Sequence, residues 1–148
     1  MAERKSVLLV EDNPDDRDLT LRAFDRHKLR EAVVVAEDGQ AALEYLHAPG
    51  PDGQLRPLPE VVLLDLKLPK VDGLEVLRRI RAEERTRLLP VVMLTSSAEE
   101  RDLVTSYALG ANSYVRKPVS FTEFLEAARA LGMYWLRLNR SAPTEPGA

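Results

Sequence analysis

The segment Val61-Val62-Leu63-Leu64-Asp65 decides the fold, because four aliphatic residues in a row end directly at a carboxylate. Such a run predicts a strand that is buried on both faces, as in a parallel sheet covered by helices on each side. Ligands of these sheets bind just beyond the carboxyl ends of the strands. Asp65 is therefore expected at the ligand-binding edge of the sheet.

Three further segments repeat this pattern of an apolar run that ends at reactive side chains. Val7–Val10 leads to Glu11-Asp12, Val91–Leu94 leads to Thr95-Ser96, and Tyr114-Val115 leads to Lys117-Pro118. Because the carboxyl ends of parallel strands share one edge, we expect three carboxylates, a hydroxyl and an ammonium group in one crevice. That set of groups suits a divalent metal ion and a phosphoryl group.

Composition narrows the class of protein. The chain has 148 residues, a formal net charge of -3 and no cysteine. The near balance of acidic and basic residues argues against a protein that binds nucleic acid by bulk charge. Without cysteine, neither a disulfide framework nor a cysteine-based zinc site is possible. The N-terminus lacks the apolar region of a signal peptide, and no apolar run approaches the ~20 residues of a membrane-spanning helix. We therefore expect a cytoplasmic protein that does not contact a membrane.

The remaining segments predict five strands that alternate with five helices. The expected strands are Ser6–Val10, Ala32–Ala36, Val61–Leu64, Val91–Leu94 and Ser113–Val115. Helices are expected from Asn13-Pro14 to about His27, after the turn Glu37-Asp38-Gly39, and over Leu74–Glu84, Glu99–Leu109 and Ser120–Leu138. Ser120 and Glu123 form a capping box at the start of the last helix. One domain should span residues 1–140, and the Pro-, Gly-, Ser- and Thr-rich tail 141–148 is expected to be disordered.

The ordered set Glu11-Asp12, Asp65, Thr95-Ser96 and Lys117-Pro118 resembles the receiver domain of bacterial two-component response regulators. The resemblance covers roughly residues 5–140. It implies an α/β, flavodoxin-like (βα)5 receiver fold with a five-stranded parallel sheet in the order 2-1-3-4-5. In that order the first and third strands are neighbours, which brings Glu11, Asp12 and Asp65 together.

A magnesium site follows from these three carboxylates. Close carboxylates raise one another's pKa values, and a cation resolves the conflict. Ligands that are all oxygen, with waters retained, suit Mg²⁺. The resemblance implies that Asp12 and Asp65 bind the metal directly, that Glu11 acts through water, and that the backbone carbonyl of Lys67 completes the protein ligands. The alternative is that Glu11 and Asp12 merely solvate the end of a strand.

Asp65 is the expected phosphoacceptor, because a carboxylate can attack phosphorus and form an acyl phosphate. Its strand is central, and a loop rather than a helix follows it. Lys117 supplies a positive charge for the phosphoryl oxygens. Thr95 offers a hydroxyl donor, and Ser96 offers a backbone N–H. The resemblance also implies a cis Lys117–Pro118 bond that aims the lysine into the site.

The resemblance further implies a conformational switch. Thr95 would move toward the phosphate and Tyr114 would rotate inward to fill the vacated space, which changes the face formed by the last two helices and the strand between them. Alternatively, Tyr114 is an ordinary half-buried aromatic residue. Lys67 stands two residues after the phosphoacceptor, and Ser97 cannot orient a water molecule as a carboxylate would. We therefore expect slow autodephosphorylation and a long-lived phosphoaspartate, unless Lys67 simply points into solvent.

No output segment is recognisable after Arg140, so we expect signalling by protein–protein contact through that same face. Apolar residues of the last predicted helix recur every three or four positions: Phe121, Phe124, Ala128, Leu131, Trp135 and Leu138. This seam, with further apolar residues beside it, predicts one face against the sheet and another in a homodimer. The alternative is a helix whose end folds back on its own domain. His27 and His47 are expected at the surface.

The Pro-rich loop Ala48–Pro59 and the ending from Gly110 to Leu136 are similar to single-domain regulators of phytochrome-type histidine kinases, which are the expected partners. Three other classes of protein fit this sequence less well. An aspartate-nucleophile phosphatase needs an acid at the position of Lys67, and a nucleotide or flavin binder needs a glycine-rich first loop. A phosphorylation-independent adaptor typically lacks part of the acidic trio, which this chain keeps. The protein is thus expected to be a phosphoacceptor with self-catalysed phosphotransfer and not an enzyme with a separate substrate.

Overall fold

The computed structural model describes residues 5–143 as a five-stranded parallel sheet with helices on both faces. The strands are β1 (Val7–Val10), β2 (Val33–Ala36), β3 (Val61–Leu64), β4 (Val91–Thr95) and β5 (Ser113–Arg116). The helices are α1 (Pro14–Arg26), α2 (Gly39–His47), α3 (Gly73–Ala82), α4 (Glu100–Ala108) and α5 (Phe121–Met133). Short turns η1 (Arg30–Ala32) and η2 (Tyr134–Leu138) precede β2 and follow α5. The strand order is β2-β1-β3-β4-β5, as predicted.

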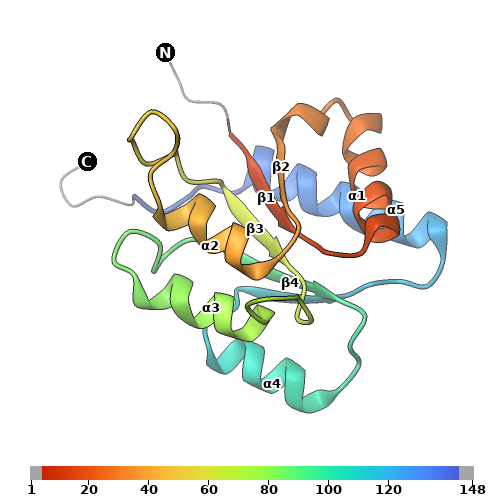
Figure 1. Cartoon of the computed structure of the whole chain (residues 1–148). Coiled ribbons are helices and arrows are strands. Elements are labelled where there is room, and N and C mark those ends of the chain that lie inside the picture. Colours follow the sequence, from red (N-terminus) through yellow and green to blue (C-terminus); the bar gives the residue numbers. More distant parts are fainter. Residues whose placement is uncertain (1–4, 144–148) are drawn as a thin grey trace.

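The sheet separates two apolar layers. Successive side chains of a strand point to opposite faces. Leu8 and Val62 therefore pack among residues of α2 and α3, while Leu9 and Leu63 pack among residues of α1 and α5. Figure 1 shows this arrangement, with α1 and α5 on one side of the sheet and α2, α3 and α4 on the other. Every residue of β1, β3 and β4 is buried, which confirms the prediction of central strands covered on both faces.

Local signals define the helix starts. The Asn13 side chain accepts hydrogen bonds from the backbone N–H groups of Asp15 and Asp16, and Pro14 occupies the first helical position, so α1 begins where predicted. The Asp38 carboxylate caps α2 through the Ala41 N–H, and the Ser120 hydroxyl caps α5 through the Glu123 N–H. The first helix therefore begins two residues after Asp12, directly beside the crevice.

The last helix differs from the prediction. It does not run as one α-helix to Leu138, because the α-helical turns end at Met133 and a π-turn covers Tyr134–Leu138. The middle of the expected seam lies in the domain's own core: Phe124 and Ala128 are buried, and Trp135 is 9% exposed. Of the seam residues, Phe121 and Leu138, at its two ends, are exposed. Most of the seam therefore faces the sheet and is not available to a second subunit.

Helix α4 is placed as predicted but contributes little to the core. Of its residues only Ser106 is buried, while Leu103 and Tyr107 are exposed and Val104 is 60% exposed. Among residues 5–143, no helix is long and apolar enough to cross a membrane. Of the tail expected to be disordered, residues 144–148 lie outside the described residues, and Ser141 donates a hydrogen bond to Glu60.

Candidate functional site

The register of the two central strands brings the acidic residues together. Val10 of β1 pairs with Leu64 of β3, so the next residues, Glu11 and Asp65, lie side by side at the carboxyl edge. Each of Glu11, Asp12 and Asp65 offers a carboxylate oxygen, and these oxygens all lie within 4.8 Å of one another. The structure thus brings together the acidic trio that the sequence places at this edge.

Lys117 directly follows the edge strand β5, and its side chain reaches the same cluster of carboxylates. Its Nζ lies 2.5 Å from Glu11 Oε1 and 3.1 Å from Asp65 Oδ2. Its backbone N–H donates to the Thr95 carbonyl at 2.7 Å, which continues the pairing of β4 and β5 past the end of the strands. The expected cis Lys117–Pro118 bond is not observed, since residues 5–143 contain no cis peptide bond. The trans form is the common state of X–Pro bonds, and the lysine enters the site with it.

Burial and opposing charges determine the protonation states of Glu11 and Lys117. Burial raises the pKa of Glu11 to about 7; the adjacent Lys117 opposes that shift, and the negative charge of Asp65 adds to it. Burial alone would lower the pKa of Lys117, but the carboxylates of Asp16, Glu11 and Asp65 outweigh it and raise this pKa above its ordinary value. Lys117 therefore stays protonated and supplies the positive charge of the site.

Asp16 also belongs to this cluster, although the sequence motifs did not indicate it as a site residue. Asp16 Oδ2 accepts a hydrogen bond from Lys117 Nζ at 2.9 Å. The available signal was the position of the helix start. Because α1 begins two residues after Asp12, its acidic first turn lies close to the crevice.

The predicted phosphate-binding groups differ in exposure. Thr95 is buried, whereas Ser96 and Lys67 are exposed.

The Thr95 hydroxyl oxygen accepts from the Ser97 N–H at 3.2 Å, and the half-buried Tyr114 donates its hydroxyl to the Ser97 carbonyl at 3.0 Å. Both residues of the predicted switch therefore contact the same residue, Ser97.

Close backbone packing fixes the loop after Asp65. A Cβ on Gly73 would lie 2.1 Å from the Asp65 carbonyl oxygen, and one on Gly39 would lie 1.9 Å from the Val71 carbonyl oxygen. The Gly73 N–H donates to Leu66 O at 2.8 Å. Glycine at both positions lets the first turns of α2 and α3 approach the loop that carries Asp65 and Lys67.

These residues fit a hard divalent cation. The donor set consists of carboxylate oxygens, with no nitrogen or sulfur ligand in the trio, as Mg²⁺ prefers. The exposed Asp12 gives the trio an open side toward solvent, where water ligands can remain.

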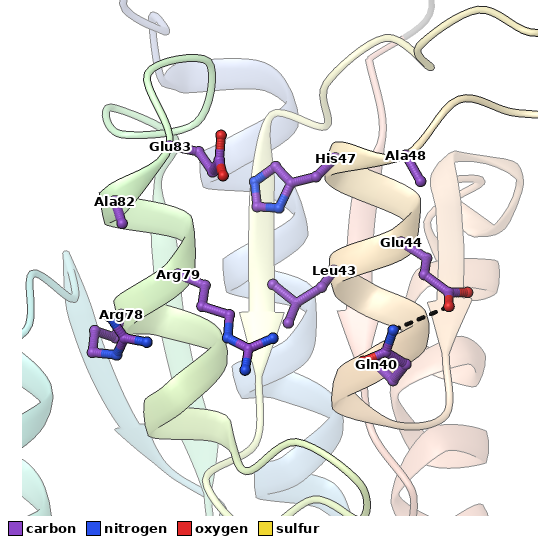
Figure 2. A pocket seen from close by; sticks show the side chains of 9 residues that line it. All are labelled: Gln40, Leu43, Glu44, His47, Ala48, Arg78, Arg79, Ala82 and Glu83. Atoms are coloured by element: carbon purple, nitrogen blue, oxygen red, sulfur yellow. Dashed lines mark hydrogen bonds between the residues drawn. The ribbon is translucent and has the colours of Figure 1, made fainter.

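A second hollow lies away from this cluster. The groove between α2 and α3 has a volume of about 410 Å³, and it is lined by Gln40, Leu43, Glu44, His47, Ala48, Arg78, Arg79, Ala82 and Glu83. Figure 2 shows His47 between the two helices. Thr86 donates its hydroxyl to the Ile80 carbonyl, so it accepts from His47 Nε2, 3.0 Å away. His47 is partly buried, whereas a surface position was expected, and burial lowers its pKa. His27 is exposed, as predicted.

Comparison with known proteins identifies the family. Residues 7–129 match the response regulator receiver domain, and the chain belongs to this family. It is 46% identical to the probable methanogenesis regulatory protein FilR2 of Methanothrix harundinacea over 91% of this chain and 86% of that protein. It is 34% identical to response regulator Rcp1 of a Synechocystis strain over 89% of each chain.

Solved structures agree with this assignment. The phosphorylated cyanobacterial phytochrome response regulator RcpA superposes with a TM-score of 0.87 at 33% identity, covering 95% of this chain and all of that one. The Mn(2+)-bound form of Rcp1 gives 0.84 at 32% identity, covering 94% and 99%. The bacteriophytochrome response regulator AtBRR is 54% identical, with a TM-score of 0.70 and coverage of 94% and 100%. The chain is thus a receiver domain similar to phytochrome-associated regulators.

Proposed function

We propose that this protein accepts a phosphoryl group from a histidine kinase on Asp65, in a reaction that depends on Mg²⁺. The observation that carries the proposal is the meeting of the Glu11, Asp12 and Asp65 carboxylates with the Lys117 ammonium group. One relative was crystallised in a Mn(2+)-bound form and another in a phosphorylated form, which supports both parts of the proposal.

In the proposed site, Asp12, Asp65 and the Lys67 carbonyl hold the metal, and Glu11 acts through water. When bound, Mg²⁺ screens the carboxylates from the incoming phosphoryl group and stabilises charge on its oxygens. An Asp65 oxygen attacks phosphorus as the bond from phosphorus to the kinase imidazole breaks, and that imidazole nitrogen takes up a proton. Lys117, the Thr95 hydroxyl and the Ser96 N–H then bind the phosphoryl oxygens.

The proposed switch is supported by the shared contact at Ser97. The Thr95 hydroxyl oxygen accepts from the Ser97 N–H, so a movement of Thr95 toward the phosphate stretches that bond and pulls on Ser97. Moving Ser97 disturbs the bond from Tyr114, which can then rotate inward. The result is a population shift between two packings of the α4–β5–α5 face.

We propose that this face carries the output, as a homodimer contact and a surface for protein partners. The seam no longer supports the dimer, since most of it is internal. Support comes instead from the exposed Leu103, Val104 and Tyr107 of α4 and from a groove of about 700 Å³ along β5 and α5, where Tyr134 is exposed. Light scattering of the phosphorylated and unphosphorylated protein tests the dimer, and a monomer at high concentration in both states contradicts it.

A phytochrome-type kinase is the proposed partner, because regulators associated with phytochromes are among the similar structures. A cytoplasmic location and slow autodephosphorylation belong to the same proposal. The partner is tested by profiling phosphotransfer from candidate kinases, and equal transfer from unrelated kinases argues against the assignment.

The central test uses acetyl phosphate with and without Mg²⁺. We expect a phosphorylated species in intact-protein mass spectrometry only when Mg²⁺ is present, and no such species for Asp65→Asn. Asp72→Asn, an exposed carboxylate before α3, serves as the matched control and should be labelled like the wild type. Labelling of Asp65→Asn would refute Asp65 as the phosphoacceptor, and an unlabelled wild type would favour an adaptor that works without phosphorylation.

A further inference from the structure

The ammonium group of Lys117 is shared among three carboxylates. A protonated lysine has three N–H donors and no acceptor. In this structure Nζ lies within hydrogen-bond distance of Glu11, Asp16 and Asp65. Each donor thus has one carboxylate partner, and a phosphoryl oxygen can bind Lys117 only if one of these partners is released.

The three partners differ in how easily they can be released. The Glu11 side chain is 3% exposed, and a buried carboxylate that loses its cation is left with an uncompensated charge. Asp65 itself carries the phosphoryl group in the proposed reaction. The Asp16 side chain is 28% exposed, and it stands on α1 outside the acidic trio, so water can solvate it after release.

We propose that Asp16 is a positioning residue that competes with the phosphoryl group for Lys117, an inference that rests on the proposed function. Before phosphorylation Asp16 holds the lysine on the α1 side of the crevice. When the acyl phosphate forms on Asp65, Lys117 exchanges its bond to Asp16 for a bond to a phosphoryl oxygen. The strength of the bond to Asp16 therefore limits how readily Lys117 reaches the phosphoryl group.

The same contact has the opposite effect on the metal. Lys117 repels a cation bound to the acidic trio, and Asp16 partly neutralises that positive charge. Removing Asp16 should therefore weaken Mg²⁺ binding while it speeds phosphorylation at saturating Mg²⁺. A general loss of structure would lower both quantities, so the opposite signs are diagnostic.

The test compares Asp16→Asn with Asp15→Asn, which removes the same charge from the same helical turn at an exposed position. With acetyl phosphate at saturating Mg²⁺, we expect Asp16→Asn to be phosphorylated about threefold to fivefold faster than the wild type, the range for loss of one partly exposed ion pair. Asp15→Asn should stay close to the wild type. Equal rates in the two variants, or slower labelling of Asp16→Asn, overturn the proposal.

Mg²⁺ titration by calorimetry provides a readout that needs no phosphorylation. We expect the dissociation constant of Asp16→Asn to rise about threefold relative to that of Asp15→Asn. In a Lys117→Ala background the difference between the two variants should shrink, because the part of the Asp16 effect that acts through the position of the lysine is then absent. If Lys117→Ala does not fold, the comparison of the single variants still decides.

This titration also separates the two possible failures. If the wild type is not labelled, the proposed function fails while the Mg²⁺ measurements still report on the contact between Asp16 and Lys117. If the wild type is labelled but Asp16→Asn and Asp15→Asn behave alike in both measurements, only the role of Asp16 is refuted.

Discussion

The candidate site has a buried half and an open half that are built differently. The buried half consists of Glu11, Thr95 and Lys117, which are 2%, 1% and 7% exposed. Backbone hydrogen bonds and an ion pair hold these residues at the ends of the strands. Asp12, Lys67 and Ser96 are exposed and lie on the loops that follow those strands. The buried half therefore fixes charge and position, while the open half leaves room for a metal ion, for water and for the phosphodonor of the proposed reaction.

This difference implies that substitutions in the two halves have different consequences. In the buried half a lost side chain leaves a partner without compensation in a low-dielectric region, so the folded state itself is destabilised. In the open half water replaces the lost contact, so stability changes little and only the chemistry of the site is affected.

The largest expected effect comes from exchanging lysine for alanine in the two halves. Lys117→Ala removes the cation from Glu11 and Asp65 and should lower the free energy of unfolding by about 3 kcal/mol at pH 8. Lys67→Ala, its control in the open half, should change it by less than about 0.5 kcal/mol. Urea denaturation without metal measures both, and equal losses would show that the two halves are not distinct.

The buried half also illustrates what the sequence can predict. Four apolar runs predict four of the five strands, and the resemblance to receiver domains implies their order. Pairing of β1 with β3 then makes Glu11 and Asp65 neighbours. The contact of Asp16 with Lys117 was missed, because it depends on how far the first turn of α1 overhangs the sheet. That distance results from packing in three dimensions and not from residue spacing.

The prediction for the last helix was wrong for a related reason. A spacing of three and four residues marks an apolar face but does not say which surface covers it. Ala128 and Trp135 pack into the layer formed with α1, and Leu131 packs against that layer, which accounts for most of the seam without a second subunit. The π-turn after Met133 then keeps Trp135 and Leu136 in that layer.

A second expected effect is a pH dependence that originates in Glu11. Its pKa in the folded protein is raised from 4.5 to about 7, so between these values the folded state binds more protons than the unfolded state. Stability from this group is complete below pH 4.5 and is lost as the pH rises through 7. At about 1.4 kcal/mol per pKa unit, the loss is on the order of 3 kcal/mol.

Glu11→Gln provides the comparison, because glutamine does not titrate. In metal-free urea denaturation at pH 5 and pH 8, we expect the wild type to lose stability relative to Glu11→Gln as the pH rises. Asp12→Asn, from the open half, should keep the pH dependence of the wild type. Parallel curves for the wild type and Glu11→Gln would show that Glu11 is already ionised at pH 5.

The smallest expected effect concerns the lifetime of the phosphoaspartate and is confined to the open half. The exposed Lys67 can pair with the phosphoryl group and shield it from water, so Lys67→Ala should shorten the half-life about twofold to fivefold, as for one solvent-exposed ion pair. Lys70→Ala is the matched control, because Lys70 lies in the same loop but pairs with Asp38 at 3.4 Å. The decay is followed by phosphate-affinity electrophoresis after the donor is removed. Since neither lysine supports the buried half, unfolding free energies should remain at the wild-type value. An unchanged half-life in Lys67→Ala, or equal shortening in both variants, would mean that Lys67 points into solvent and leaves the acyl phosphate unprotected.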